Sequence, residues 1–197
     1  MRTSDLARSI GALGCLAVLL WCAAPQAGFA QTLVRSASAS LPALPKMGPS
    51  FRESVALTSG EKPGTVIIDR NERALYLVTG RDSALRYRIS VGREGFGWSG
   101  IVTVGAKKEW PEWRPPADMR AREPGLPSFV PAGPYNPLGA RALYLHRAGR
   151  DTLYRIHGTN DPAGVGFDGT SGCIRLTNTD VMDLYKRVSI GSKVVVQ

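Results

Sequence analysis

Short runs of alternating or continuous apolar residues, separated by polar turns, dominate the chain from residue 64 onward. Residues 65–68 and 74–78 flank a polar turn, and residues 85–91 alternate apolar with polar side chains. Runs of this length and period are typical of β-strands, and their close spacing predicts an antiparallel meander. The folded part is therefore built around a sheet. Further runs of the same kind occupy residues 101–104, 142–145, 153–157 and 193–196.

One helix is predicted, near the end of the sequence. Thr177 and Asp180 have the spacing of a capping box, and apolar residues recur at helical spacing from 181 to 188 until Gly191 ends the pattern. We expect a short amphipathic helix there. Together with the strands, it predicts a mainly β fold, a sheet or sandwich with one short helix close to the C-terminus.

The first thirty residues have the pattern of an export signal. Arg2 and Arg8 make a basic start, residues 10–24 form an almost unbroken apolar run, and residues 28–30 offer small side chains for cleavage before residue 31. An uncleaved membrane anchor is the alternative, but the run is shorter than the roughly 20 residues that span a bilayer. We expect residues 1–30 to be a signal peptide, with no membrane-spanning segment left after cleavage and the mature protein in the periplasm or cell envelope.

Composition changes after the signal. Residues 31–63 are rich in Ser, Ala and Pro without helical or strand period, which predicts a linker or loosely packed lead-in before a folded domain at 64–197. The chain has a net charge of +9, and loss of Arg2, Arg8 and Asp5 with the signal leaves +8. In an exported protein this charge favours anionic envelope polymers over nucleic acid, for which no binding motif is present; solubility explains it equally well.

The mature protein is expected to contain a single cysteine thiol. Cys15 and Cys22 lie in the signal, so Cys173 remains alone and no disulfide can form within the chain. A lone thiol in an oxidising compartment is a liability unless it is buried, pairs between chains or performs chemistry.

A proline-rich stretch separates the strands near residue 109 from those near residue 142. Residues 111–137 contain eight prolines, which predicts a long loop without regular secondary structure. Trp110 and Trp113 open this loop, and long loops of this kind often cover functional sites. The two tryptophans either cover a site or simply pack on the sheet.

The residues that point to chemistry lie between positions 157 and 176. A thiol is a weak nucleophile at neutral pH unless a base or a positive charge is nearby, and His157 is the candidate base for Cys173. The other histidine, His146, precedes an apparent hairpin turn and is a weaker candidate.

Side-chain direction supports a site around Cys173. If residues 173–176 are extended, Ile174 and Leu176 share the face toward the core, whereas Cys173 and Arg175 point together to the other face. Thiol and guanidinium then line one cleft, where Arg175 lowers the pKa of the thiol or holds a substrate carboxylate. The backbone amides around Gly172 and Cys173 are candidates for an oxyanion hole.

These residues resemble the signature of the L,D-transpeptidase catalytic domain, also called the YkuD domain. The similarity rests on residues 157–160, which read His-Gly-Thr-Asn, on residues 171–176, which read Ser-Gly-Cys-Ile-Arg-Leu, and on Asn178. It extends over residues 136–145 and the closing strand, so that it covers about 64–197. The resemblance implies a mainly β fold with one short helix after the catalytic cysteine, and a catalytic domain at 64–197.

The resemblance also implies an enzyme that remodels peptidoglycan. Cys173 would attack the bond between the L-centre of diaminopimelate and the terminal D-alanine of a tetrapeptide stem, form a thioester, and exchange protons with His157. Arg175 and Asn178 would shape the donor site, with Gly172 and Cys173 supplying oxyanion amides. Family members often carry a second histidine where this chain has Ser171. The remaining candidates for substrate binding are Ser171, Gly158, Thr159, Asn160, Trp110 and Trp113.

Several alternatives stay open at the level of the sequence. A sortase usually has its histidine much further upstream, and a papain-like protease has its cysteine before its histidine. A non-catalytic wall-binding module would explain the basic charge and the tryptophans, but not the intact Cys–His–Arg set. The acyl acceptor is a second stem, an envelope protein, or water in a carboxypeptidase. We expect no cofactor and no metal, because no dinucleotide, phosphate or metal-ligand motif is present; the sequence carries no signal for the oligomeric state.

Overall fold

A computed structural model describes residues 44–197 of the chain. The expected signal peptide at 1–30 and the first part of the expected lead-in, 31–43, lie outside the described residues. No helix of the described part is long and apolar enough to cross a membrane.

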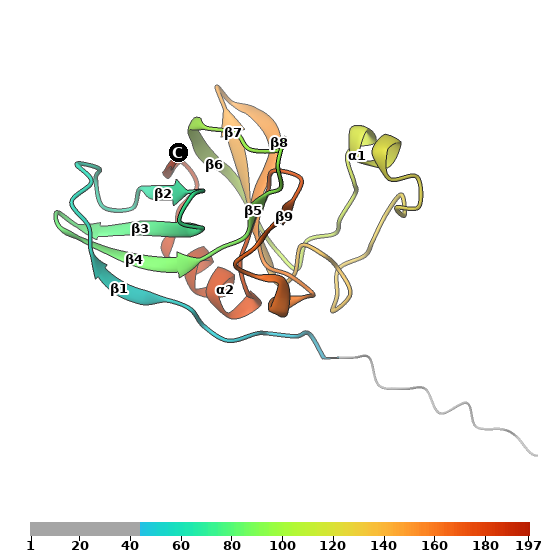
Figure 1. The fold of residues 1–197 in the computed structure, drawn as a ribbon, viewed down its shortest axis with the longest axis horizontal. Coiled ribbons are helices and arrows are strands. Elements are labelled where there is room, and N and C mark those ends of the chain that lie inside the picture. The colour runs from blue at the N-terminus through green and yellow to red at the C-terminus, as the bar shows by residue number, and fades with distance from the viewer. Residues whose placement is uncertain (1–43) are drawn as a thin grey trace, which may run out of the picture. The chain divides into compact units, whose positions relative to one another are not determined.

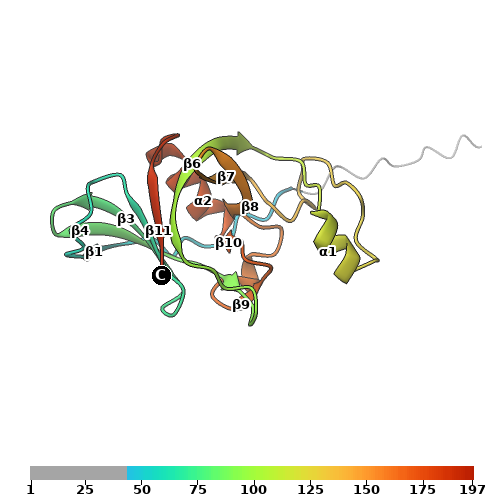
Figure 2. The same ribbon diagram turned by 90° about the horizontal axis from the view of Figure 1, so that it is seen from above.

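Strands make up most of the regular structure of residues 44–197, as the sequence predicts. Nine of them form one sheet, in the order β1-β4-β3-β2-β11-β6-β7-β8-β10, and β5 and β9 form a separate parallel pair (Figures 1 and 2). The elements are β1 (Glu53–Ala56), β2 (Val66–Asp69), β3 (Ala74–Gly80), β4 (Ser83–Arg88), β5 (Val91–Gly92), β6 (Gly100–Glu109), α1 (Ala117–Arg122), β7 (Arg141–Arg147), β8 (Arg150–His157), the 3-10 turn η1 (Pro162–Gly164), β9 (Asp168–Thr170), β10 (Ile174–Arg175), α2 (Asn178–Arg187) and β11 (Lys193–Val196).

The predicted meander is confirmed by β2, β3 and β4, which pair antiparallel in sequence order. The last strand joins this meander to the rest of the sheet, because Val194 of β11 lies beside Val66 of β2 in parallel and beside Val102 of β6 in antiparallel pairing. All three valines are buried. This strand is thus paired along both edges, with parts of the chain that are far apart in sequence.

The predicted helix is confirmed as α2, which follows the cysteine directly. The Thr177 side chain caps it by accepting a hydrogen bond from the backbone N–H of Asp180, 3.2 Å away. The reciprocal contact of a capping box is absent among the described residues, because the Asp180 carboxylate accepts from Ser50 Oγ at 2.6 Å and from the N–H of Phe51 at 2.9 Å. This cap therefore also ties the residues that precede β1 to the helix.

The apolar face of α2 packs on the sheet. Val181 and Leu184 are fully buried in the same cluster as Leu143 of β7 and Ile156 of β8. Complete burial of such side chains stabilises a fold by roughly 2 kcal/mol each. The strand that carries His157 and the helix that follows Cys173 thus share one core.

Two expectations about irregular segments are wrong. Residues 53–56, within the expected lead-in, form β1, which pairs antiparallel with β4 at the edge of the sheet. Three of its four residues are exposed, so a strand period in apolar residues does not arise. Residues 117–122, within the proline-rich loop, form α1, because residues 117–123 are the longest proline-free stretch there and Pro116 stands at the N-cap, where a proline costs no hydrogen bond. Helix α1 has no buried residue and lies away from the sheet (Figures 1 and 2).

Candidate active site

The site is built on two neighbouring parallel strands, β8 and β10. Their register places Arg175 beside His157. Ile174 and Leu176 are buried in the core, whereas Cys173 is partly exposed, which confirms the predicted alternation of faces. Because His157 ends β8 and Cys173 directly precedes β10, the parallel pairing brings residues sixteen positions apart in the sequence to neighbouring strands, with His157 buried and Cys173 partly exposed.

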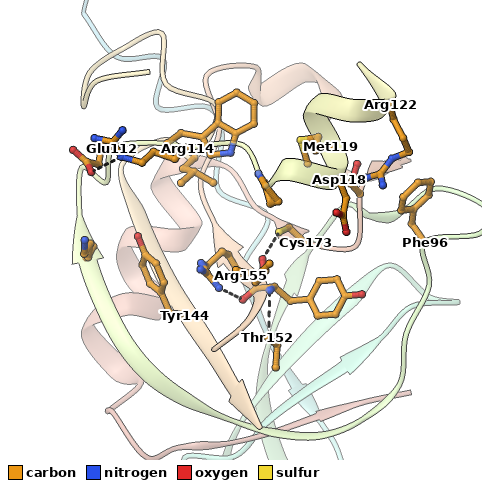
Figure 3. A pocket seen from close by; sticks show the side chains of 17 residues that line it. Phe96, Glu112, Arg114, Asp118, Met119, Arg122, Tyr144, Thr152, Arg155 and Cys173 are labelled. Atoms are coloured by element: carbon orange, nitrogen blue, oxygen red, sulfur yellow. Dashed lines mark hydrogen bonds and ion pairs between the residues drawn. The ribbon is translucent and has the colours of Figure 1, made fainter. Parts of the chain in front are cut away.

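Cys173 lines a cavity of about 470 Å³. One wall comes from β7 and β8, and the opposite wall from residues 112–122, which include α1. Figure 3 shows Met119 and Asp118 of α1 on the far side of the cavity from Cys173. The proline-rich segment therefore covers the cavity. Of its two tryptophans, Trp113 takes part in this cover.

The Cys173 thiol rests against a backbone carbonyl. Among the described residues, the carbonyl of Leu153 is its hydrogen-bond partner, with Sγ and oxygen 3.9 Å apart, and no hydrogen bond joins Sγ to His157. Burial raises the pKa of the Cys173 thiol, the charge of Asp151 raises it further, and the Arg155 backbone and side chain lower it. The resting cysteine is therefore a neutral thiol.

The imidazole of His157 is buried and neutral. Its Nδ1 lies 2.6 Å from the carbonyl oxygen of Gly158, and since a carbonyl only accepts, Nδ1 carries the proton and Nε2 has a free lone pair. Burial lowers the pKa of His157 to about 4; the hydrogen bond to Gly158 opposes this, and the positive charges of Arg175 and Arg155 add to it. At neutral pH His157 is thus a base in a defined tautomer.

The turn before the cysteine is held by side chains on both sides. Thr170 Oγ1 accepts from the N–H of Gly172 at 3.2 Å and donates to the carbonyl of Cys173 at 2.6 Å. Trp98 donates from Nε1 to the Gly172 carbonyl at 2.8 Å and stacks on Tyr154 with ring centroids 4.6 Å apart. The Gly172 amide therefore already has an acceptor, whereas the amide of Cys173 has none among the described residues. The expected oxyanion role of these amides stays a prediction.

Glycine is required at position 172 for two reasons. Its φ of +102° is a conformation that side chains rarely adopt, and a Cβ there would lie 2.5 Å from Cε1 of Tyr154. The close approach of this backbone to Tyr154 sets the path of the chain into Cys173.

The structure places Arg175 outside the cavity, so the expectation that thiol and guanidinium line one cleft is wrong. Arg175 donates from Nη2 to the carbonyl of Gly164 at 2.9 Å and lies 3.5 Å from Ser90 Oγ. The turn η1 covers this side of β10 and takes up the guanidinium, although Arg175 shares a face with Cys173. Its Nε is buried and has no hydrogen-bond partner among the described residues, and burial lowers the pKa of the group.

Asn178 does not line the cavity either, and its expected role in shaping the donor site stays a prediction. Its Oδ1 accepts from the backbone N–H groups of Ala140 at 2.8 Å and Thr159 at 3.1 Å. Its Nδ2 donates to the carbonyls of Lys46 and Thr159, both at 2.7 Å. The amide is buried and fully used, so it clamps three segments of backbone together.

The residues that follow His157 have structural contacts as well. Gly158 and Thr159 are buried, and Thr159 Oγ1 accepts from the N–H of Asp161 at 3.0 Å. Asn160 donates from Nδ2 to the carbonyl of Tyr135 at 3.0 Å, which attaches the end of the proline-rich segment to the loop after β8. None of the three lines the cavity, and their expected role in substrate binding stays a prediction.

The two tryptophans of the proline-rich segment differ in position: one lines the cavity and the other does not. Trp113 lines the cavity and exchanges two backbone hydrogen bonds with Val130, of 2.9 and 2.8 Å, which hold the segment as an ordered loop. Trp110 lies outside the cavity lining and ties the end of β6 to Ala140 through its backbone N–H at 2.8 Å. Of the motif residues after the histidine, Ser171 joins Cys173 in the cavity lining.

The sequence reasoning missed charged residues around the thiol. Arg155 lines the cavity, stands two positions before His157 on β8 and therefore shares its face. The strand alternation would have identified it. Asp151 pairs with Arg155, but no local pattern indicates this because the chain between them is irregular. The full set of charged side chains in the cavity lining is Lys108, Glu112, Arg114, Asp118, Arg122 and Arg155.

Comparison with known proteins agrees with the fold and the motif. The family model of the L,D-transpeptidase catalytic domain, YkuD, matches residues 63–196. The chain therefore belongs to the L,D-transpeptidase catalytic domain family. The probable L,D-transpeptidase YbiS of Escherichia coli is 36% identical over 162 residues, which cover 77% of this chain and 50% of that protein. The chain spans about half the length of the curated Escherichia coli relatives that it matches.

Solved structures show the same fold. An L,D-transpeptidase of Enterococcus faecium is 17% identical, with a TM-score of 0.52 over 69% of this chain and 50% of that one. A Brucella melitensis structure, described as a probable carnitine operon oxidoreductase, is 45% identical, with a TM-score of 0.51 over 74% of this chain and 92% of that one. The resemblance to L,D-transpeptidases extends to the mainly β architecture as a whole.

Proposed function

We propose that this protein is an exported peptidoglycan L,D-transpeptidase in which Cys173 is the nucleophile and His157 the base. The observation that carries the proposal is the placement of a cysteine in a cavity, one strand away from a buried histidine whose Nδ1–H is held by the Gly158 carbonyl. Family membership supports the reaction type. The substrate is the diaminopimelate–D-alanine bond of a tetrapeptide stem.

The first half-reaction moves the thiol proton to the histidine. On substrate binding Cys173 rotates away from the Leu153 carbonyl, and Nε2 of His157 accepts the proton from Sγ. The sulfur attacks the carbonyl carbon of the L-centre, and the free amide of Cys173 donates to the developing oxyanion. When the C–N bond breaks, His157 returns the proton to the leaving amine, so that D-alanine departs and a thioester remains on Cys173.

The second half-reaction transfers the acyl group to an amine. Nε2 of His157 takes a proton from the incoming amine as its nitrogen attacks the thioester, and the sulfur leaves and recovers that proton. An amine of a second stem gives a 3–3 cross-link, and an envelope protein with a free amine gives protein anchoring. Water in place of the amine gives L,D-carboxypeptidase activity by the same steps.

The neutral state of both groups suits this sequence of steps. Because the pKa of His157 is lowered to about 4, the imidazole is unprotonated at neutral pH and can accept the thiol proton. Because the pKa of Cys173 is raised, the thiolate does not accumulate before substrate arrives. Proton transfer is then coupled to attack within the bound complex.

The charges of the cavity support a stem peptide as the ligand. Lys108, Arg114 and Arg122 offer partners for the carboxylates of a stem, and Glu112 and Asp118 offer partners for its ammonium group. A peptide stem carries both kinds of group. The net charge of +8 left after removal of residues 1–30 also favours approach to an anionic wall.

Exposure to a carbapenem, a β-lactam that acylates nucleophiles, tests the nucleophile. Intact-protein mass spectrometry should show one adduct on the protein and none on Cys173→Ala, and His157→Gln should form the adduct much more slowly. Products from tetrapeptide stems, separated by chromatography, then identify the acceptor. A folded protein with a free thiol that takes up no carbapenem and releases no D-alanine would instead favour a non-catalytic wall-binding module.

Fractionation of cells tests export. The protein should be recovered from the periplasm or envelope starting at residue 31, which N-terminal sequencing would show. Replacing residues 10–24 with polar residues should retain it in the cytoplasm at full length.

A further inference from the structure

The backbone beside the Cys173 thiol has an unusual conformation. Leu153 has a φ of +64°, which is rare for a bulky residue. It lies within β8 at a break in register with β7: the pairs His146↔Asp151 and Tyr144↔Arg155 leave one residue of β7 opposite three of β8. Such bulges redirect the backbone groups of a strand, and residues held in rare conformations are often tied to function.

Side chains on both sides of the bulge hold it in place. Asp151 Oδ1 accepts from the N–H of Leu153 at 2.9 Å. Arg155 binds the same carboxylate with both ends of its guanidinium, at 2.6 and 2.8 Å, and donates to the carbonyl of Tyr154 at 2.9 Å. Arg155 also lies over the ring of Tyr144, 4.1 Å from its centroid. The left-handed residue is thus fixed by a charged pair that spans it.

The bulge turns the Leu153 carbonyl toward the nucleophile. This carbonyl is the acceptor that lies 3.9 Å from Cys173 Sγ. Figure 3 shows Cys173 and the Arg155 guanidinium together on the floor of the cavity, with their contacts to β8 dashed. In a regular strand, successive carbonyls point alternately toward the two neighbouring strands. The Leu153 carbonyl therefore faces the thiol only while the bulge is kept.

We propose that Asp151 and Arg155 are positioning residues for Cys173, which hold the bulge so that the Leu153 carbonyl accepts a hydrogen bond from the thiol and keeps it neutral and in place until substrate binds. The proposal rests on Cys173 being the nucleophile. An acceptor for S–H favours the protonated form, and Asp151 compensates the positive charge of Arg155 close to the sulfur. Storage as a thiol also protects the cysteine, because thiolates are the forms that are alkylated and oxidised.

Other charged and titratable groups face the sulfur across the cavity or lie next to it. His157 lies beyond Arg155 on the same strand and is neutral at pH 7. The groups on the remaining elements are Tyr144 of β7, Lys108 of β6, and Glu112, Arg114, Asp118 and Arg122 of the covering segment. Both signs are present among them. The pair on β8 differs from these because it fixes the backbone that contacts the thiol.

The replacement Asp151→Asn tests the proposal. The amide oxygen still accepts from the Leu153 N–H, so the turn is retained, while the charge on Arg155 is left uncompensated beside the sulfur. We expect the midpoint of the pH dependence of Cys173 alkylation by iodoacetamide, read on the Cys173 peptide by mass spectrometry, to fall. The rate at pH 7 should rise about threefold or more, since half a pKa unit is a threefold change in thiolate. The rate plateau at high pH should stay unchanged.

Turnover provides a second measurement. The kcat for release of D-alanine should fall about tenfold in Asp151→Asn with KM within about twofold, because the substrate contacts remain while a cysteine held as thiolate brings no proton for His157 to pass to the leaving amine. Asp151→Glu, which can keep the ion pair, should recover part of the loss. Glu53→Gln is the matched control: it removes one carboxylate from an ion pair with Arg86, 2.8 Å, at the far edge of the sheet, and should match the wild type in every measurement.

Two outcomes would overturn the proposal. An unchanged alkylation midpoint in Asp151→Asn would show that the pair does not set the state of the thiol. A higher rate plateau at high pH, accompanying the shift of the midpoint, would mean that the substitution has loosened the site and merely exposed the thiol. Alkylation needs no turnover, so the test is independent of the proposed activity: if a midpoint shift accompanies an absence of D-alanine release, the positioning role stands and the proposed function falls.

Discussion

His157 donates a hydrogen bond from Nδ1 to the carbonyl of Gly158, the next residue in the chain, over 2.6 Å. This short local contact decides which nitrogen of the ring carries the proton. It leaves Nε2 free to act as a base, and the burial of both residues keeps solvent from competing for the carbonyl. In the proposed mechanism, a main-chain oxygen thus takes the orienting role that a carboxylate has in many catalytic triads.

The first prediction concerns the pH dependence of acylation. Because the pKa of His157 is lowered to about 4, the base stays neutral over most of the acidic range. The rate of acylation of Cys173 by a single acyl donor should hold from neutral pH to about pH 5 and be halved near pH 4. Stopped-flow or quenched mass spectrometry gives the profile. A midpoint near the ordinary histidine value of about 6.5 would contradict a buried neutral base.

The second prediction concerns stability. A histidine whose folded pKa lies below its unfolded value binds protons more readily in the unfolded chain, so its contribution to stability is complete above about pH 6.5 and is lost as pH falls toward 4. A shift from 6.5 to about 4 corresponds to roughly 3 kcal/mol. The free energy of unfolding, from urea titrations at a series of pH values, should therefore fall more steeply over this interval in the wild type than in His157→Gln. Parallel curves for the two proteins would contradict it.

The third prediction separates folding from substrate binding at Asn178. Removing its amide in Asn178→Ala leaves the N–H groups of Ala140 and Thr159 and the carbonyl of Thr159 without this partner in the interior. We expect a loss of about 2–4 kcal/mol in the free energy of unfolding. KM for the stem, measured below the melting temperature, should remain close to the wild-type value. A large rise in KM with unchanged stability would instead place Asn178 in the donor site.

The fourth prediction compares two glycines. Gly172→Ala meets both a left-handed backbone and the Tyr154 ring, 2.5 Å from the new Cβ, whereas Gly149→Ala has a φ of +77° but open space around it. Gly149→Ala should cost about 1 kcal/mol and leave acylation intact. Gly172→Ala should cost about 2 kcal/mol or more and slow acylation at least about tenfold, because the backbone that leads into Cys173 must move. Thermal melts and carbapenem acylation measure both, and equal effects of the two substitutions would contradict the role of Tyr154.

Much of the fold follows from patterns that are local in sequence. The alternation of apolar residues predicts the meander, and the Thr177 cap and the helical spacing predict α2. The same alternation correctly places Ile174 in the core and Cys173 on the open face. These features depend on the period of a strand or helix, which neighbouring residues determine by themselves.

Which loop covers a given face of a strand or helix depends on contacts between residues that are distant in the sequence. Arg175 shares a face with Cys173, yet the turn at Gly164 captures its guanidinium and removes it from the cavity. Asn178 stands in the motif, yet its amide is used up by backbone that includes Lys46, 132 positions away. Neither contact can be predicted from a local period of residues, because each depends on which loop packs against that part of the fold.

The sequence by itself determined the mainly β class of the fold and the likeness to one catalytic family, and it predicted Cys173 and His157 as the candidate pair, since all of these depend on residue types and short spacings. Only the tertiary structure decided the state of that pair. The depth of burial that lowers the pKa of His157, and the bulge at Leu153 that contacts the thiol, arise where strands meet across a sheet. Solvent exclusion and backbone strain are properties of the assembled fold, and no segment carries them alone.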